Sequence, residues 1–568
     1  MRSRSERNPS AALLSAFAKP FMSEADISMP TRAAALQRVA ASPSSERSAS
    51  TSDLSSTFVP PFATTTEGVA SLLRKVFSFP AMLATFLVGR VFYEARAFNV
   101  DPDLWWHIKV GQNIVTSHHW PTSDPFSYTV AGNPWMAYEW LGDVVIGMVA
   151  RVGGLLGLDI FLFVWASIVM LTLYAYTTLR SGNSKAGFVV SALLCSMAFA
   201  TFNLRPQMLA YLFLIVTLIA LERFRQGKQR AIWFLPPMFL LWINTHGSWV
   251  IGLGVIFIFL ASGLLEFRWG SIEARRWSSA ERIRLESVLL LSLAAIPFTP
   301  YGTQLAAYPF TVASSLPLNV GNILEWQPMP FNVLGGKLFL AIVLGFFLVQ
   351  MMAPLSLRLY EVVLLFGGIT MACLHVRFLV LFVPFASPVF AVLLARWLPP
   401  YDRKKDHPIL NAILMTGAFI AMAWYFPTRA SIEKIAARTF PVRAVEYLRQ
   451  HPVAGPMFNT YGYGGYLVGM LPEQKVFIDG RGDLYEDAGI FGEYLELAQV
   501  KPGAFQVLRA HNIQWCLLES KEPLATVLGV SSEWEKRYTD GVSTLFVRRE
   551  PGYSQNTTTR PGTGSAKE

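Results

Sequence analysis

The sequence predicts an all-α polytopic membrane protein with a small C-terminal α/β domain. Of its 568 residues, 52% are hydrophobic and 15% are charged, whereas soluble domains carry about 25% charged residues. The mean hydropathy is +0.37. Long apolar runs recur from about residue 76 to 426, and a different pattern of short apolar segments begins near 436. This composition argues against a soluble enzyme and excludes a disordered polymer.

About eleven apolar runs are separated by short polar breaks, and each approaches the roughly 20 residues that a helix needs to cross hydrocarbon. Their approximate cores are 76–94, 156–177, 186–203, 207–222, 231–246, 248–265, 287–302, 336–353, 358–374, 377–396 and 409–426. Several contain Pro or Gly, which membrane helices tolerate when neighbouring helices satisfy the freed carbonyl groups. We therefore expect a transmembrane domain over 75–430 whose first outer loop covers 95–155.

Lys and Arg indicate the orientation in the membrane. The predicted inner loops hold sixteen of them and the predicted outer loops hold six, which matches the positive-inside rule. Residues 1–74 are rich in Ser, Thr and Arg without sustained apolar runs, which predicts a disordered, basic cytoplasmic tail. This topology explains the excess of basic over acidic residues, so we expect a lipid bilayer and no nucleic acid as a partner.

An odd number of crossings places the C-terminal region outside the cytoplasm. Over 436–550 the apolar segments shorten to strand length at 476–478, 515–518 and 544–547, and helical stretches at 444–449, 504–510 and 523–528 lie between them. Alternating short strands and helices predict an extracytoplasmic α/β domain. The polar residues 551–568 are expected to be a disordered tail.

Polar side chains collect in the predicted outer loops, where an unpaired charge beside hydrocarbon is costly. They are Asp101, Asp103, Trp106, His107, Arg205, His246, Glu325, His375 and Arg377. Several have a structural alternative: Arg205 and Arg377 can reach toward lipid headgroups, His246 and His375 can be turn residues, and Glu325 can be an ordinary loop carboxylate. Most of the Trp side chains at 105, 106, 120, 135 and 140 are expected to form an interfacial belt.

The two carboxylates of Asp101-Pro102-Asp103 are the strongest candidates for a catalytic or metal-binding role. Two carboxylates beside a membrane helix can bind a divalent ion such as Mg²⁺ or Mn²⁺, or one can act as a general base toward an acceptor hydroxyl. The structural alternative is an N-cap for a helix that begins near Leu104. Residues 104–116 and 138–152 are predicted to form two interfacial helices that present this pair.

These features resemble the GT-C superfamily of integral membrane glycosyltransferases. The resemblance comprises the acidic D-x-D pair in the first outer loop, the two interfacial helices there, the number of crossings and the outer C-terminal α/β domain. The runs 101–107, 124–128, 139–141, 459–466 and 476–481 look like a bacterial group within it, similar to lipid A and dolichyl-phosphate-mannose glycosyltransferase-like proteins. The chain lacks the W-W-D-Y-G motif of oligosaccharyltransferases.

The resemblance implies transfer of a sugar from a polyprenyl-phosphate carrier to an extracytoplasmic acceptor, at the inner membrane of a bacterium. Asp101 or Asp103 would be the base or would help to hold a metal. Physical reasoning adds that a departing lipid phosphate needs fixed cations. Arg205 and Arg377 are the candidates for this role, assisted by His246 or His375, while Glu325 contacts sugar hydroxyls or assists the base.

Two pairs of residues are candidates for binding the acceptor. Trp106 and His107 follow the acidic pair, and Asp479 and Arg481 form a charged turn in the outer domain, for which a structural ion pair is the alternative. Two other classes of protein compete with a transferase. A transporter would show charges at the membrane midplane and repeated halves, and a non-catalytic membrane scaffold would leave the acidic pair without a use.

Overall fold

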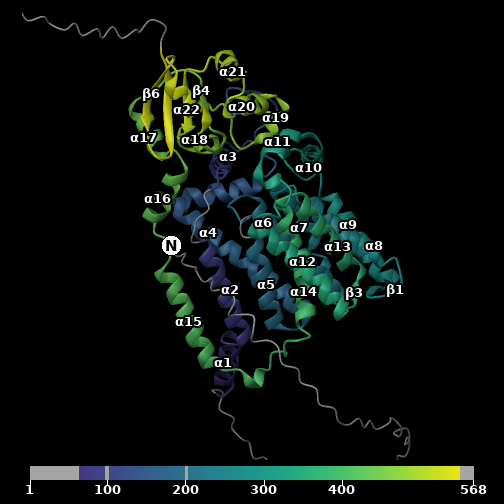
Figure 1. The fold of residues 1–568 in the computed structure, drawn as a ribbon. Coiled ribbons are helices and arrows are strands. Elements are labelled where there is room, and N and C mark those ends of the chain that lie inside the picture. Colours follow the sequence, from purple (N-terminus) through teal and green to yellow (C-terminus); the bar gives the residue numbers. More distant parts are fainter. Residues whose placement is uncertain (1–62, 96–100, 199–201, 550–568) are drawn as a thin grey trace, which may run out of the picture. The chain divides into compact units, whose positions relative to one another are not determined.

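The computed structural model describes residues 63–95, 101–198 and 202–549. The predicted tail at 551–568 and residues 1–62 of the predicted N-terminal tail lie outside the described residues. The prediction of disorder is wrong for residues 63–74, which are helical. Helices dominate the chain as far as residue 439 (Figure 1). They are α1 (Ala63–Val76), α2 (Phe79–Ala95), α3 (Leu104–Ser117), α4 (Trp140–Ser181), α5 (Ser184–Ala198), α6 (Gln207–Arg225), η3 (Gln229–Ile232), α7 (Leu235–Thr245), α8 (Trp249–Ser262), α9 (Ser279–Ala294), α10 (Gln304–Ser315), α11 (Pro317–Asn322), η4 (Leu324–Trp326), α12 (Leu334–Met352), α13 (Leu359–Leu374), η5 (Val376–Phe378), α14 (Leu379–Leu394), η6 (Arg403–Lys405), α15 (Pro408–Trp424) and α16 (Arg429–Thr439).

Each of the eleven predicted apolar runs contains a helix, although not every helix is long enough to span a bilayer. Among the described residues, four helices have the length and hydropathy for a membrane span: α4, α6, α12 and the continuous segment Val376–Leu394. The pair α15 and α16, bent by 60°, would be a fifth. The bend falls at Pro427, where proline interrupts the backbone hydrogen bonds of a helix. Shorter apolar helices are α5, α8 and α13.

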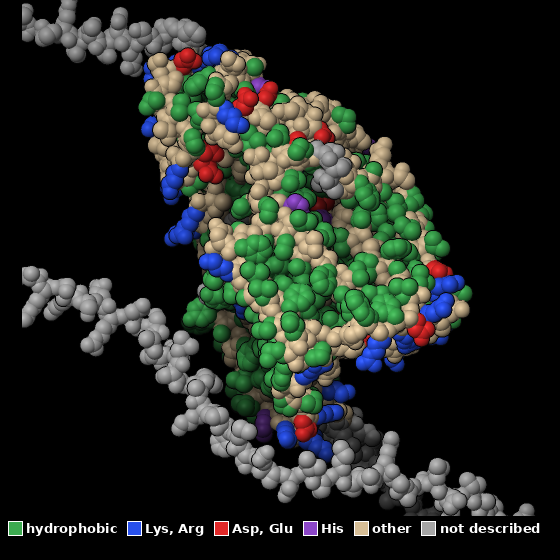
Figure 2. Space-filling view, turned by 45° about the vertical axis from the view of Figure 1, so that its right-hand side comes forward, with side chains coloured by type: hydrophobic (Ala, Val, Ile, Leu, Met, Phe, Trp, Pro, Cys, Tyr) green, Lys and Arg blue, Asp and Glu red, His purple; other side chains and the backbone are tan. Residues whose placement is uncertain are grey.

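Hydrophobic side chains cover much of the surface between charged regions. Figure 2 shows a broad hydrophobic area, with Lys and Arg gathered along its lower edge. Exposed apolar residues include Leu241, Phe257, Leu344 and Phe366. Apolar surface of this extent is typical of helices that face lipid rather than water.

The first and the last apolar helices lie side by side. Figure 1 shows α2 beside α15. Asn411 of α15 donates a hydrogen bond to the carbonyl oxygen of Phe77 at 2.9 Å, and the Phe79 amide donates to Asp406 at 3.1 Å. The N-terminal end of the helical region is therefore held by its C-terminal end.

The helices that carry the first outer loop cross at two glycines. A Cβ atom at Gly111 of α3 would overlap the backbone of Asp143 in α4, and one at Gly147 would lie 2.9 Å from the amide nitrogen of Gln112. Helix α4 changes direction at Gly154, whose φ of 57° and ψ of −150° are open essentially to glycine alone. The predicted helix at 138–152 is thus the first arm of α4.

The C-terminal region combines a four-stranded sheet with short helices. Its sheet has the order β4-β5-β7-β6, in which β4 and β5 are parallel and the other pairs antiparallel. The elements are α17 (Val442–Gln450), β4 (Met457–Asn459), α18 (Tyr461–Met470), α19 (Gly482–Asp487), α20 (Ile490–Ala498), α21 (Ala504–Ala510), β5 (Trp515–Glu519), α22 (Pro523–Val530), β6 (Trp534–Thr539) and β7 (Ser543–Arg548). The predicted strands at 515–518 and 544–547 and the three predicted helices are present.

The predicted strand at 476–478 is wrong. Val476 pairs with the first outer loop instead: its amide donates to the carbonyl oxygen of Phe126, and its own carbonyl accepts from the Tyr128 amide, both at 3.2 Å. The apolar character of this segment reflects burial between the C-terminal region and the loop, not membership of the sheet.

A second, three-stranded sheet lies elsewhere in the chain. Strands β1 (Phe267–Trp269) and β2 (Ile272–Ala274) form a hairpin, and β2 pairs in parallel with β3 (Leu357–Arg358). This sheet connects the segment after α8 with the start of α13.

The predicted aromatic belt is wrong for three of its members. Trp105, Trp106 and Trp135 are 7%, 3% and 6% exposed, so they are core residues. Trp105 packs edge-on against Tyr466 of α18 with ring centroids 4.9 Å apart. Helix α18 covers Trp105 and Trp106 of α3, whereas Trp135 packs against the Arg481 guanidinium.

Candidate functional site

Arg205 joins the acidic pair to a distant loop. It lies just before α6, and its Nε atom is 2.7 Å from Asp101 Oδ2, while Nη2 is 2.9 Å from Asp103 Oδ2. Its Nη1 atom is 3.5 Å from Glu325 Oε1. One guanidinium fork therefore contacts three carboxylates from two segments that are distant in the sequence, an arrangement that suits its planar set of donors.

The two aspartates of the pair have different surroundings. Asp101 Oδ1 accepts a hydrogen bond from the Asp103 amide at 2.8 Å, and its side chain is 1% exposed. Asp103 precedes α3 but makes no capping hydrogen bond with its side chain. Its carboxylate is directed to Arg205 and is 15% exposed. Helix capping by Asp103 is thus excluded, and Asp103 is the more accessible carboxylate.

Burial places the pKa of Asp103 near neutrality. Burial raises the pKa of this carboxyl to about 7, although the Arg205 charge beside it lowers the pKa. Burial also tends to lower the pKa of Arg205, but Asp101 and Asp103 hold it well above its usual value. The cluster therefore contains a permanent cation next to a carboxyl group that can exchange a proton at neutral pH.

Arg377 reaches the same cluster from η5. Its Nη1 atom is 3.6 Å from Glu325 Oε1, and its guanidinium carbon lies 4.0 Å from the centre of the Trp326 ring. His375 Nδ1 is 2.5 Å from the carbonyl oxygen of Trp326. Glu325 thus stands between Arg205 and Arg377, and Trp326 and His375 hold the loop that carries it.

A second polar group adjoins the cluster and centres on Glu139, which directly precedes α4. Glu139 Oε1 is 3.2 Å from His246 Nε2, and its Oε2 atom is 3.9 Å from His107 Nε2. His107 Nδ1 lies 2.6 Å from Asp143 Oδ1. Burial raises the pKa of Glu139 to about 8, against the lowering effect of Arg205 and Arg377. Burial, and then the Arg205 charge, hold the pKa of His107 well below its usual value.

The sequence analysis did not single out Glu139 or Asp143 as site residues. Glu139 belongs to a run that carried the family resemblance, and Asp143 is an acidic residue in an apolar stretch. A carboxylate inside such a stretch is expensive without a partner, which is the signal that could have identified Asp143. His107 and His246, by contrast, were predicted and lie within this group.

Asp479 and Arg481 form a different, fully buried ion cluster. Arg481 Nη2 is 2.6 Å from Asp479 Oδ2 and 2.7 Å from Asp124 Oδ1, and all three side chains are 0% exposed. The guanidinium carbon lies 4.6 Å from the centre of the Trp135 ring. Asp124 and Trp135 belong to the first outer loop, so this cluster docks the C-terminal region onto that loop and leaves neither Asp479 nor Arg481 a free surface for an acceptor.

The turn between these two residues nevertheless touches the site. A Cβ atom at Gly480 would overlap the Asp103 carboxylate and would lie 3.1 Å from Trp106 Nε1. Trp106 is buried between the acidic pair and this turn. The C-terminal region therefore forms one wall beside Asp103.

An aromatic stack adjoins this wall. The rings of Tyr138 and Tyr308 are stacked with centroids 3.9 Å apart, and the Tyr308 hydroxyl donates to Asp483 Oδ2 at 3.0 Å. Charges of Asp483, Glu139 and Asp103 all add to the effect of burial in raising the pKa of Tyr138. The stack thus adjoins both polar groups, and the sequence analysis did not predict it.

The acidic pair does not fit a divalent ion. Asp101 Oδ2 and Asp103 Oδ2 both face the Arg205 guanidinium, which occupies the place that a cation would take. Among the described residues, no three His, Cys, Asp or Glu side chains converge in a metal-binding group.

Comparisons with known proteins give structural similarities only. No family model and no curated protein matches the chain. One similar solved structure is the Archaeoglobus fulgidus oligosaccharyltransferase tethered with an acceptor peptide containing the NVT sequon, at 12% identity over 78% of this chain and 70% of that one, with a TM-score of 0.49.

Two further similar structures carry lipid phosphates. Archaeal AglB from Archaeoglobus fulgidus, in complex with an inhibitory peptide and a dolichol-phosphate, is 10% identical over 83% of this chain and 74% of that one (TM-score 0.45). ArnT from Cupriavidus metallidurans, bound to undecaprenyl phosphate, is 13% identical over 84% and 98% (TM-score 0.45).

Proposed function

We propose that the chain is a membrane glycosyltransferase that moves a sugar from a polyprenyl-phosphate donor to an extracytoplasmic acceptor such as a glycolipid, polysaccharide or protein. The observation that carries the proposal is the contact between Asp103 and Arg205. It puts a carboxyl group with a pKa of about 7 beside a buried cation. Transfer from a lipid phosphate to a hydroxyl needs a base and a cation at one place. The resemblance of the sequence to the GT-C superfamily supports the same assignment.

Asp103 is assigned as the general base and Asp101 as a positioning residue. In its ionised form, Asp103 takes the proton of the acceptor hydroxyl while the acceptor oxygen forms a bond to the anomeric carbon of the sugar. The bond between that carbon and the phosphate oxygen breaks, and its electron pair leaves with the polyprenyl phosphate. Asp101 holds the Arg205 fork through Nε and fixes the turn through the Asp103 amide.

Arg205 and Arg377 are assigned to the departing phosphate. Glu325 Oε1 lies 3.5 Å and 3.6 Å from the two guanidinium groups, longer than strong charged hydrogen bonds. Its side chain is 32% exposed, the most accessible of the cluster's carboxylates. A phosphate oxygen can replace it between the two cations, and the displaced Glu325 is then free to accept hydrogen bonds from the sugar.

The apolar helices supply the environment for a lipid donor. Helix α6 begins two residues after Arg205, and the span Val376–Leu394 includes Arg377 near its start. Both cations thus lie at ends of helices that are long and apolar enough to cross a bilayer, where a lipid phosphate would be found. We place the site on the outer face of a bacterial inner membrane, with about eleven crossings, a cytoplasmic N-terminus and an extracytoplasmic C-terminal domain.

The decisive experiment compares Asp103→Asn with Asp101→Asn and a matched control. Asp487 is an exposed aspartate of α19, so Asp487→Asn changes the same group away from the site. Proteins in lipid nanodiscs would receive a panel of labelled polyprenyl-phosphate sugars, selected by comparing cell-envelope glycans with and without the protein. We expect Asp103→Asn to slow release of polyprenyl phosphate on the order of 10³-fold and Asp487→Asn to leave it unchanged.

Three results would argue against the assignment. Turnover by Asp103→Asn at the wild-type rate would show that Asp103 is not the general base. Counterflow of a labelled solute in proteoliposomes, without any sugar transfer, would favour a transporter. Absence of both activities in a folded protein that binds a membrane partner would favour a scaffold.

A further inference from the structure

A basic pocket lies at the opposite end of α6 from Arg205. Its volume is about 550 Å³, within the roughly 300–1,000 Å³ typical of small-molecule sites. Helix α6 has 19 residues, which corresponds to a length of about 28 Å. The pocket follows the C-terminal end of this helix, whereas the acidic cluster precedes its N-terminal end. The two sites are therefore separated by one membrane-length helix.

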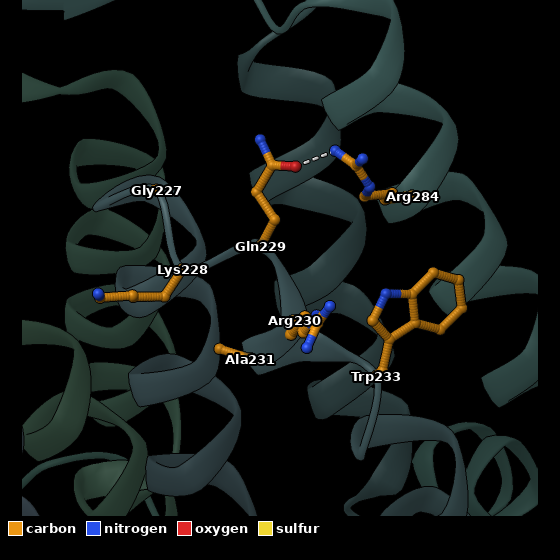
Figure 3. Close-up of a pocket in the computed structure, with 7 residues that line it drawn as sticks. All are labelled: Gly227, Lys228, Gln229, Arg230, Ala231, Trp233 and Arg284. Atoms are coloured by element: carbon orange, nitrogen blue, oxygen red, sulfur yellow. Dashed lines mark hydrogen bonds between the residues drawn. The ribbon is translucent and has the colours of Figure 1, made fainter.

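Two segments contribute the cations that line the pocket. Lys228 and Arg230 come from the connection between α6 and α7, and Arg284 comes from α9 (Figure 3). Gln229 and Arg284 point toward one another in Figure 3, and Gln229 accepts a hydrogen bond from the Arg284 guanidinium. Lys228 also lines the pocket and extends in another direction. The connection thus holds Arg284 in the pocket without neutralising it.

These cations differ from nearby arginines in their partners. Arg275 is 3.3 Å from Glu281, Arg282 is 3.3 Å from Glu286, and Arg358 is 2.5 Å from Glu222. Within residues 63–95, 101–198 and 202–549, no carboxylate forms an ion pair with Lys228, Arg230 or Arg284. Three uncompensated positive charges around one hollow favour an anionic ligand.

Aromatic rings beside the cations indicate that the ligand comes from the bilayer. Trp233 lines the pocket and is 43% exposed, and the adjacent Phe234 is 45% exposed. Tryptophan next to a cluster of Lys and Arg at the end of a membrane helix is typical of the headgroup region of a bilayer. A ligand with a phosphate and an attached apolar chain would use both the cations and the rings.

We propose that this pocket binds the phosphate of an anionic glycerophospholipid in the leaflet opposite to the acidic cluster. The guanidinium groups of Arg230 and Arg284 contact the phosphate oxygens, as their donor geometry allows. Trp233 lies against the glycerol and the upper acyl chain, and Lys228 adds a further positive charge. The site is independent of the proposed sugar transfer.

The test measures the affinity of the full-length protein, in an uncharged detergent, for dioctanoyl-phosphatidylglycerol. Dioctanoyl-phosphatidylcholine and glycerol 3-phosphate serve as the zwitterionic and the lipid-free probes. We expect R230Q/R284Q to bind phosphatidylglycerol on the order of 30-fold more weakly than wild type, and R230Q alone on the order of 5-fold more weakly. Arg230 is exposed, so its substitution does not disturb packing.

The matched control is R268Q/R276Q. It removes two charges from exposed arginines on the same predicted face, neither of which lines the pocket. We expect it to keep the wild-type affinity. Equal loss in both double variants would show a general charge effect and overturn the site. If glycerol 3-phosphate binds as tightly as phosphatidylglycerol, the pocket recognises a free phosphate ester, and the proposal of a lipid ligand is wrong.

Discussion

Gly480 lies directly against the carboxylate of Asp103. The distance from an ideal Cβ at position 480 to Asp103 Cγ would be only 2.7 Å, and the carboxylate oxygen would be closer still. The C-terminal region therefore limits the positions open to the proposed base. This contact is possible because the ion cluster around Arg481 fixes the neighbouring turn.

Gly480→Ala should displace the Asp103 side chain and reduce sugar transfer on the order of 10²-fold, because a shift of about 1 Å at a reacting group has an effect of that size. Gly462→Ala is the control, since a Cβ atom there meets nothing within 4 Å. Transfer rates and thermal unfolding would be measured for both. Equal rates in the two variants would contradict the positioning of Asp103 by this turn.

The rate of transfer should rise with pH. Burial raises the pKa of Asp103 to about 7, and only the ionised carboxylate accepts a proton. We expect kcat/KM to increase about tenfold per pH unit below this value and to level off above it. The profile would be recorded from about pH 5 to pH 9.

Glu325→Gln also tests the assignment of Asp103 as the base, because the direction in which it should shift the pH profile is known. The negative charge of Glu325 raises the pKa of Asp103, so its removal should move the midpoint of the profile to lower pH. A wild-type profile without a transition near neutrality, or a midpoint that moves upward in Glu325→Gln, would argue against Asp103 as the base.

Arg377→Gln should weaken binding of the donor phosphate. The Arg377 guanidinium lies over Trp326 and beside Glu325, and we assign it to the lipid phosphate. We expect KM for the donor to rise on the order of 10-fold, with recovery of part of the affinity in Arg377→Lys. Unchanged donor affinity in Arg377→Gln would indicate an anchor to lipid headgroups instead.

Arg481→Met should destabilise the protein. It would leave the carboxylates of Asp124 and Asp479 buried without a cation, which costs roughly 3–5 kcal/mol. The exposed pair Arg429–Glu433 offers a control, because its side chains are 80% and 54% exposed and Arg429→Gln should change little. Thermal unfolding would distinguish the two variants. Similar midpoints would mean that the docking cluster contributes little to stability.

Local patterns predicted part of the site. Asp101, Asp103, Arg205 and Arg377 were selected because each is polar and close to the end of an apolar run, and Glu325 because it lies in a long predicted outer loop. The structure joins all five in one cluster. The same reasoning wrongly left Trp105 and Trp106 in an aromatic belt. Their exposure depends on α18, which lies far away in the sequence and covers them.

The sequence by itself determined which segments form apolar helices, where the polar side chains interrupt them and that a small sheet follows. These properties depend on the hydropathy and propensity of neighbouring residues. Only the tertiary structure decided which carboxylate faces which cation: that Arg205 contacts both Asp101 and Asp103, that Glu139 lies between His107 and His246, and that Arg481 is a docking residue. Such contacts and the pKa of Asp103 depend on how distant segments pack and exclude water, which no local pattern records.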